Sequence, residues 1–266
     1  MKQWGIVLLA GQAYGDYGRI LDNLDFLGML YHREHATCAG TLYTPNVFLT
    51  AAICLARKQR DYSVLTSATL AASPNCTLAK NRFAHDKDSR GVLSRRIKIT
   101  KTFQHPQFNH YGTSAFNAGV AVLAQYPHPY PQYWRLVELD EFNISTLSLT
   151  NLTLVGWANT WFNQFGAYGL PPTSIYLAKK HPMECSHPRP EFPDAEFCPF
   201  PPANHPELCD YYFGSPLVLK STRPVTIVGL KSWSGQCTQL LRSQPFVRTN
   251  AIFDWVESLV ENSTLY

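Results

Sequence analysis

Short apolar segments rich in β-branched and aromatic residues recur along the chain, separated by turns of Gly, Pro, Asn and Ser. Segments of this kind predict β-strands, and their repeated spacing is typical of an all-β sandwich or barrel. The clearest predicted strands lie at Val47–Ala52, Arg96–Thr102, Val120–Ala124, Leu152–Trp157 and Val225–Trp233.

Two segments depart from this pattern. Residues 251–261 place apolar side chains at the i, i+3, i+4, i+7 spacing that predicts an amphipathic helix. Eight prolines lie between His181 and Cys209. Because proline has no backbone N–H to donate, this second segment is expected to be a long surface loop rather than part of a sheet.

Composition narrows the class of protein. The 266 residues are 45% hydrophobic and 16% charged, which excludes a chain kept disordered by its charge and allows one large β domain or two smaller ones. A net charge of +4 is too small to indicate a nucleic-acid partner. No apolar run approaches the ~20 residues that span a bilayer, so no membrane span is expected.

The N-terminus predicts secretion. Met1-Lys2-Gln3 is followed by the apolar run Trp4–Ala10 and then by small residues, the order found in signal peptides, so we expect a signal peptide over 1–15. The alternative is a buried first strand. Four N-x-[ST] sequons, at Asn75, Asn143, Asn151 and Asn262, also favour a secreted glycoprotein, in a compartment where disulfides persist.

Seven short motifs carry a resemblance to a known family. Thr37–Leu42 reads T-C-A-G-T-L and Phe48–Cys54 reads F-L-T-A-A-I-C, and the pair resembles the C-G-G-S-L and V-L-T-A-A-H-C of trypsin-like serine proteases. The others follow in the family's order at Phe103–Asn109, Asn117–Leu123, Gly156–Ala158, Cys209–Leu217 together with Val228–Trp233, and Phe253–Val256.

The resemblance runs from about residue 26 to 262 and implies the fold. We expect a domain over 16–266 made of two packed six-stranded antiparallel barrels, at about 26–135 and 136–250. A C-terminal α-helix over 251–261 is expected to follow the second barrel.

The residues that carry the family's chemistry differ in this chain. A catalytic histidine, aspartate and serine are expected at positions occupied here by Ile53, Gly119 and Phe213. None of the three has a nucleophile or a proton acceptor in its side chain, so the resemblance implies a scaffold that is not an enzyme.

The surrounding positions are altered as well. Tyr211 occupies the position of the family's oxyanion-hole glycine, and Tyr212 that of the acidic residue that pairs with the N-terminus formed on activation. Arg19-Ile20 lies too close to the first strand to be an activation cleavage site. The specificity pocket has Ser234 and Phe246 at its two rim glycines, and Glu207 at its base. We expect the Phe246 ring to fill the pocket and Glu207 to be structural.

Cysteine use follows the family with one residue left over. The resemblance implies the pairs Cys38–Cys54, Cys185–Cys198 and Cys209–Cys237, and it places Leu152 and Leu219 where a fourth bridge would lie. Loss of both cysteines together is expected when a buried bridge becomes an apolar contact. Cys76 remains, either as an inert thiol or as a bridge to a partner or a second copy.

Other features suggest where such a protein binds. Two loops that border the cleft in active proteases are rich in aromatic side chains here. We expect these side chains to bind a partner protein, and the alternative is that one loop packs on the other. The residues are Trp161, Phe162, Phe165, Tyr168, Phe192, Phe197 and Phe200. Lys80–Lys101 holds eight Lys or Arg residues, which fits either a heparin-like patch or a solvated face. The histidine spacing favours no metal site, and no cofactor is expected.

These observations predict a secreted, inactive serine-protease homologue that acts by protein binding. Its partners would be secreted or cell-surface proteins, as a regulator of proteases or as a reproductive or immune signalling component. The alternatives are an active hydrolase with displaced catalytic residues and a secreted glycan-binding protein.

Overall fold

The computed structural model describes residues 26–66, 96–109, 115–124, 137–139, 152–156, 173–176, 195–197, 212–219, 225–232 and 245–263. The predicted signal peptide, 1–15, lies outside these residues. Within them, no helix combines the length and the apolar character needed to cross a bilayer.

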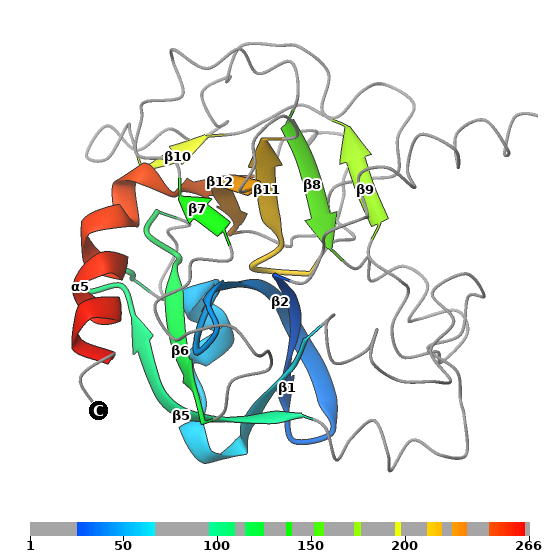
Figure 1. Ribbon diagram of the computed structural model, residues 1–266, viewed down its shortest axis with the longest axis vertical. Coiled ribbons are helices and arrows are strands. Elements are labelled where there is room, and N and C mark those ends of the chain that lie inside the picture. The colour runs from blue at the N-terminus through cyan, green and yellow to red at the C-terminus, as the bar shows by residue number, and fades with distance from the viewer. Residues whose placement is uncertain are drawn as a thin grey trace, which may run out of the picture.

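Six antiparallel strands in the first half of the chain close into a barrel (Figure 1). Their order around the barrel is β1-β2-β3-β6-β5-β4. The strands are β1 Leu27–His32, β2 His35–Thr44, β3 Val47–Thr50, β4 Tyr62–Thr66, β5 Ile97–Gln104 and β6 Gly119–Leu123. The structure therefore confirms the first predicted barrel. Three of the strands were expected from their apolar pattern, and their ends differ from the prediction by one or two residues.

The second half forms a seven-stranded sheet with the path β10-β13-β12-β11-β8-β9 and β7 added beside β12. Its strands are β7 Val137–Leu139, β8 Leu152–Gly156, β9 Thr173–Tyr176, β10 Glu196–Phe197, β11 Pro216–Leu219, β12 Val225–Lys231 and β13 Phe246–Arg248. We expected a second six-stranded antiparallel barrel here. The described strands form a sheet of seven instead, and β7 runs parallel to β12, with Glu138 opposite Thr226.

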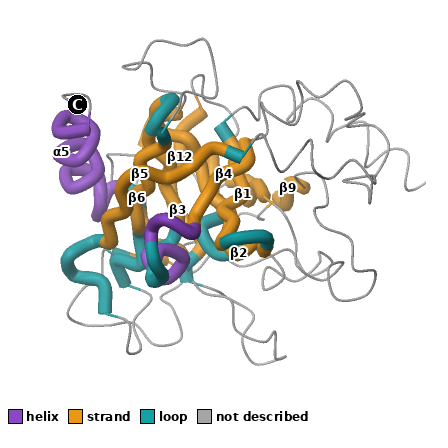
Figure 2. Tube along the Cα trace, turned by 90° about the horizontal axis from the view of Figure 1, so that it is seen from below, coloured by secondary structure: helices purple, strands orange, loops and turns teal. Residues whose placement is uncertain are grey.

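One apolar core joins the barrel, the sheet and the C-terminal helix. The cluster includes Leu49 from β3, Leu230 from β12 and the fully buried Val256 of α5 Phe253–Ser263. The helix lies along one side of the molecule, beside β5 and β6 (Figure 2). The Tyr43 hydroxyl also joins the helix to the barrel by donating a hydrogen bond to Glu257. The predicted C-terminal helix is thus confirmed, preceded by the 3-10 turn η7 Asn250–Ile252.

Candidate functional site

The positions that the resemblance assigns to the histidine and the aspartate are neighbours. Ile53 lies in the 3-10 turn η2 Ala52–Leu55, directly after β3, and Gly119 begins β6 opposite Thr50 of β3. A Cβ atom on Gly119 would lie 3.2 Å from the Cα of Ala52 and 2.8 Å from a methyl of Leu55. The backbone therefore brings these two positions together, and a side chain on Gly119 would require the Leu55 methyl and the Ala52 backbone to shift.

Phe213, at the position assigned to the serine, approaches the same segment from the second half of the chain. Its carbonyl accepts a hydrogen bond of 2.8 Å from the Ala39 N–H of β2. Its ring packs against the barrel core that contains Cys38 and Cys54, which are joined by a disulfide with a Cα–Cα separation of 6.1 Å. Ile53, Gly119 and the turn that contains Phe213 therefore lie close to the end of β3.

Asn117 is a residue of this site that sequence reasoning did not single out. It is 3% exposed, and its Oδ1 accepts a hydrogen bond of 3.0 Å from the backbone N–H of Ile53. Its Nδ2 donates a hydrogen bond of 2.8 Å to the carbonyl of Ser232, at the end of β12. One buried amide therefore ties the barrel to the second sheet directly behind Ile53. The sequence feature that could have identified Asn117 is its position as a polar residue shortly before the wholly apolar strand β6.

Replacing Asn117 by alanine is expected to lower the free energy of unfolding by about 2 kcal/mol, because it leaves two backbone groups without their partner. Urea unfolding would measure the change. The matched control is Gln107→Ala, which removes an exposed amide and should alter stability by less than about 0.5 kcal/mol. Equal effects of the two substitutions would contradict a stabilising role for the two hydrogen bonds of the Asn117 amide.

Phe246, which the resemblance assigns to the rim of the specificity pocket, lies beside a second large buried side chain. Phe246 and Lys231 are both 0% exposed and lie opposite one another on β13 and β12. Directly opposed residues of neighbouring antiparallel strands have side chains on the same face of a sheet. Lys231 was not singled out from the sequence, although it stands where the family motif V-G-I-V-S-W has a valine.

Tyr212 precedes Phe213 and is un-ionised at neutral pH. Burial, with a smaller contribution from the neighbouring Tyr31, raises the pKa of Tyr212 to about 12. It packs on the edge of the shared core rather than carrying charge. It therefore offers no carboxylate with which a newly cut N-terminus could pair.

His105 is a buried imidazole directly after β5, and the contacts of its ring are packing contacts. Its ring stacks on Phe116, with centroids 4.7 Å apart, and meets Trp255 of α5 edge-on at 4.8 Å. Its Nδ1 accepts a hydrogen bond from the N–H of Gln107. Burial lowers the pKa of His105 to about 4, so the ring is neutral at physiological pH.

This lowered pKa predicts a loss of stability in acid. The unfolded chain binds a proton at His105 near pH 6.5, whereas the folded protein binds it only near pH 4. Because of this difference at His105, the free energy of unfolding should decrease by about 3 kcal/mol as the pH drops from 6.5 to 4. Denaturant unfolding of the unmodified protein and of His105→Phe at both pH values would measure it. Equal losses in the two proteins would show that other groups control the acid response.

Most of the other predicted site residues lie outside the described part of the chain. These are Asn75, Cys76, Asn143, Asn151, Trp161, Phe162, Phe165, Tyr168, Cys185, Phe192, Cys198, Phe200, Glu207, Cys209, Ser234 and Cys237. Phe197 lies on β10 and Asn262 in the last turn of α5, but their side chains are not described. Leu152 and Leu219, where the family has a bridge, are directly opposed on β8 and β11.

The chain as a whole is similar to known trypsin-like proteins. A family model described as Trypsin matches residues 21–256. A protein described as trypsin, from Saccharopolyspora erythraea, is 23% identical over 219 residues, which cover 82% of this chain and 84% of that protein.

Two solved structures share the fold. Kallikrein-related peptidase 10 in complex with Zn2+ superposes with a TM-score of 0.58 at 16% identity, over 90% of this chain and 97% of that one. Neuropsin, a serine protease expressed in the limbic system of mouse brain, superposes with a TM-score of 0.60 at 17% identity, over 89% of this chain and 94% of that one.

Proposed function

Because the chain belongs to the trypsin family, we propose that it is a member without proteolytic activity, which acts outside the cell by binding other proteins. The observation that carries the proposal is the set of side chains where the three catalytic positions converge. Ile53, Gly119 and Phe213 supply no nucleophile, no base and no carboxylate. The role we propose is regulation of proteases, or a place in secreted reproductive or immune signalling.

The hydroxyl groups around the site support this proposal. Thr50 Oγ1 donates a hydrogen bond of 2.7 Å to the Ala39 carbonyl, and Ser232 Oγ donates one of 2.8 Å to the Pro245 carbonyl. Ser215, two residues after Phe213, is 0% exposed. A nucleophile must reach a substrate carbonyl and pass its proton to a base. These three hydroxyls are buried, and the Thr50 and Ser232 protons are already directed at carbonyl oxygens.

The substituted pocket also supports it. A trypsin-like specificity pocket is an open slot that receives a substrate side chain, and its rim glycines leave space for that chain. Phe246 and Lys231 are fully buried at this place, so their own side chains occupy volume in the protein interior. A substrate side chain would have to displace a buried aromatic ring, at a cost of about 3 kcal/mol or more.

An exposed apolar side chain marks the surface proposed to bind. Ile53 is 42% exposed, and it alone among the large apolar side chains of the described residues reaches the surface to this extent. Phe213 is partly exposed nearby, against the Cys38–Cys54 side of the barrel. Apolar side chains at the centre of a former cleft can be buried by a protein partner, which stabilises a complex by the hydrophobic effect.

A fluorophosphonate probe tests the loss of hydrolysis. Such a probe bonds its phosphorus to an activated serine oxygen with release of fluoride, so an active serine hydrolase becomes labelled. We expect no labelling of the secreted protein in conditions that label an active trypsin fully. Labelling that disappears when one Ser or Thr is replaced would overturn the proposal in favour of an active hydrolase with displaced residues.

The binding part of the proposal needs a separate test. A photo-crosslinking amino acid at position 53 should give a discrete protein adduct in the native secretion. The same group at Asp254, an exposed residue on α5, serves as the matched control and should give none. Identical adducts from both positions, or none from position 53, would contradict a partner at the former cleft. Running the products with and without reductant also reveals any partner linked through Cys76.

A further inference from the structure

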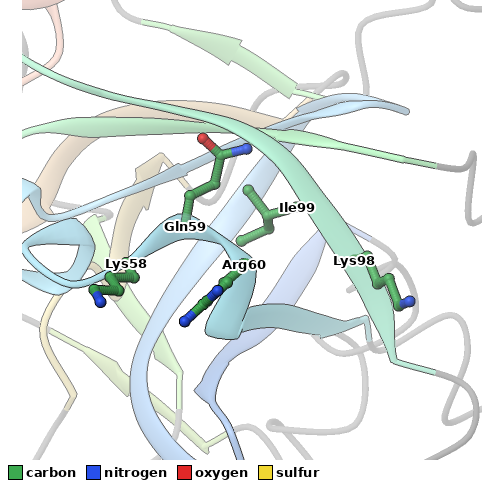
Figure 3. Close-up of a pocket in the computed structure, with 5 residues that line it drawn as sticks. All are labelled: Lys58, Gln59, Arg60, Lys98 and Ile99. Carbon is green, nitrogen blue, oxygen red and sulfur yellow. The ribbon is translucent and has the colours of Figure 1, made fainter.

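Two segments distant in sequence place three cationic side chains around one surface hollow. Lys58 and Arg60 come from the 3-10 turn η3 Gln59–Asp61 and its N-cap, and Lys98 comes from β5. Together with Gln59 and Ile99 they line an open groove of about 680 Å³. Figure 3 shows Lys98 on one side, Lys58 and Arg60 on the other, and Ile99 between them. We call these five residues the basic groove.

The nearby carboxylates do not neutralise the basic groove. Asp61 follows Arg60 in η3, but its Oδ2 lies 3.5 Å from the guanidinium of Arg33 and 3.8 Å from His32. Glu34 lies 3.0 Å from the guanidinium of Arg96. Asp61 and Glu34, the two acidic residues of the described barrel segments, therefore lie close to basic side chains outside the groove. The positive charge of the groove faces solvent, where anions can reach it.

The groove lies in the most basic part of the sequence. Residues 56–101 contain eleven Lys or Arg and three Asp, a formal charge of +8, whereas the whole chain carries +4. The remaining residues are therefore net acidic. A local excess of positive charge raises the rate at which anions associate with a protein.

We propose that the basic groove binds a sulfated polysaccharide of the heparin class. Its three cations are spread around an open hollow, which suits several sulfate groups along a flexible chain. Gln59 adds an amide that can hydrogen-bond hydroxyl and sulfate oxygens. The one apolar lining residue, Ile99, is 6% exposed, so the groove lacks the exposed aromatic or aliphatic anchor with which protein partners are usually held. These features favour a polysaccharide over an acidic peptide.

The chain offers a closely matched pair of double variants. Lys58→Ala/Lys98→Ala removes one cation of the basic groove from each of its two segments. Arg57→Ala/Lys101→Ala removes one exposed cation from each of the same two segments, but outside the groove. The two variants change the net charge equally, so they separate a defined site from general attraction. Neither touches Ile53, Gly119 or Phe213, so the result is independent of the proposed loss of hydrolysis.

The experiment measures binding of the secreted protein to a heparin dodecasaccharide at physiological salt. The groove double variant is expected to bind about tenfold more weakly, from two lost ionic contacts of ordinary surface strength, and the matched variant less than about twofold. A fully desulfated dodecasaccharide should not bind. Thermal unfolding of both variants checks that each remains folded, because Arg57 in the matched variant also contacts His32 Nδ1 at 3.0 Å.

Three results would overturn the proposal. The first is that heparin does not bind even at low salt. The second is that the two double variants weaken heparin binding equally, which would show that binding depends on net charge and not on the basic groove. The third is tighter, groove-dependent binding of poly-glutamate or single-stranded DNA than of heparin, which would assign the groove to another class of ligand.

Discussion

Replacing Gly214 by alanine is expected to lower the free energy of unfolding by about 4 kcal/mol, a large part of the stability of an ordinary domain. Gly214 has φ of +78°, which costs an alanine roughly 1–2 kcal/mol. Its Cβ would lie 2.3 Å from the Ala39 carbonyl oxygen and 2.4 Å from Thr50 Oγ1. Both atoms belong to the barrel framework, and overpacking of this kind costs about 1–3 kcal/mol more.

The neighbouring residue provides the control. Ser215 is equally buried, and its Oγ has no hydrogen-bond partner among the described residues, so Ser215→Ala should leave stability nearly unchanged. Urea unfolding of both variants gives the comparison. A Gly214→Ala protein as stable as Ser215→Ala would show that the turn at 213–215 can move away from β2.

The turn matters because it connects the two halves of the molecule. The Phe213 carbonyl accepts from Ala39 of the barrel, while the Gly214 N–H donates to the Lys231 carbonyl of the second sheet. Asn117 joins the same two halves through its amide. Loss of a catalytic side chain therefore removes none of these backbone contacts. The contacts of Phe213 and Gly214 use backbone groups, so the connection of the two halves does not depend on which side chains stand at 53, 119 and 213.

Local patterns predicted much of this fold. The apolar spacing of 251–261 identified the C-terminal helix, and β-branched runs identified β3, β5 and β6. These features depend on residues close together in the chain, so the sequence displays them directly. The parallel pairing of β7 was not expected, because three residues carry too little pattern to fix the direction of a strand.

The site was predicted in part. The assignment of Ile53, Gly119 and Phe213 to catalytic positions rests on the ordered motifs around each residue, and it stays a prediction. The roles of Asn117 and Lys231 were missed. Asn117 makes its hydrogen bonds to residues 64 and 115 positions away, and such partners are set by tertiary approach rather than by local pattern.

Restoring the three family residues is expected to yield no protease. The triple variant Ile53→His/Gly119→Asp/Phe213→Ser should give no turnover of a peptide substrate and should be less stable by about 3 kcal/mol. The exposed Ile53 leaves space for an imidazole, and Phe213 is large enough to be replaced by serine. The aspartate is the obstacle, since its Cβ would lie 2.8 Å from Leu55 and its carboxylate would enter a buried site.

The double variant Ile53→His/Phe213→Ser separates these causes. It leaves Gly119 unchanged, so it should retain more stability than the triple variant while remaining inactive. The backbone N–H of residue 53 already donates to Asn117, so an acid added at 119 could accept only from the introduced imidazole. Phe246 and Lys231 would still occupy the interior at the specificity pocket. Peptide cleavage by the triple variant, faster than by the double, would show that the side chains at 53, 119 and 213 alone keep the protein inactive.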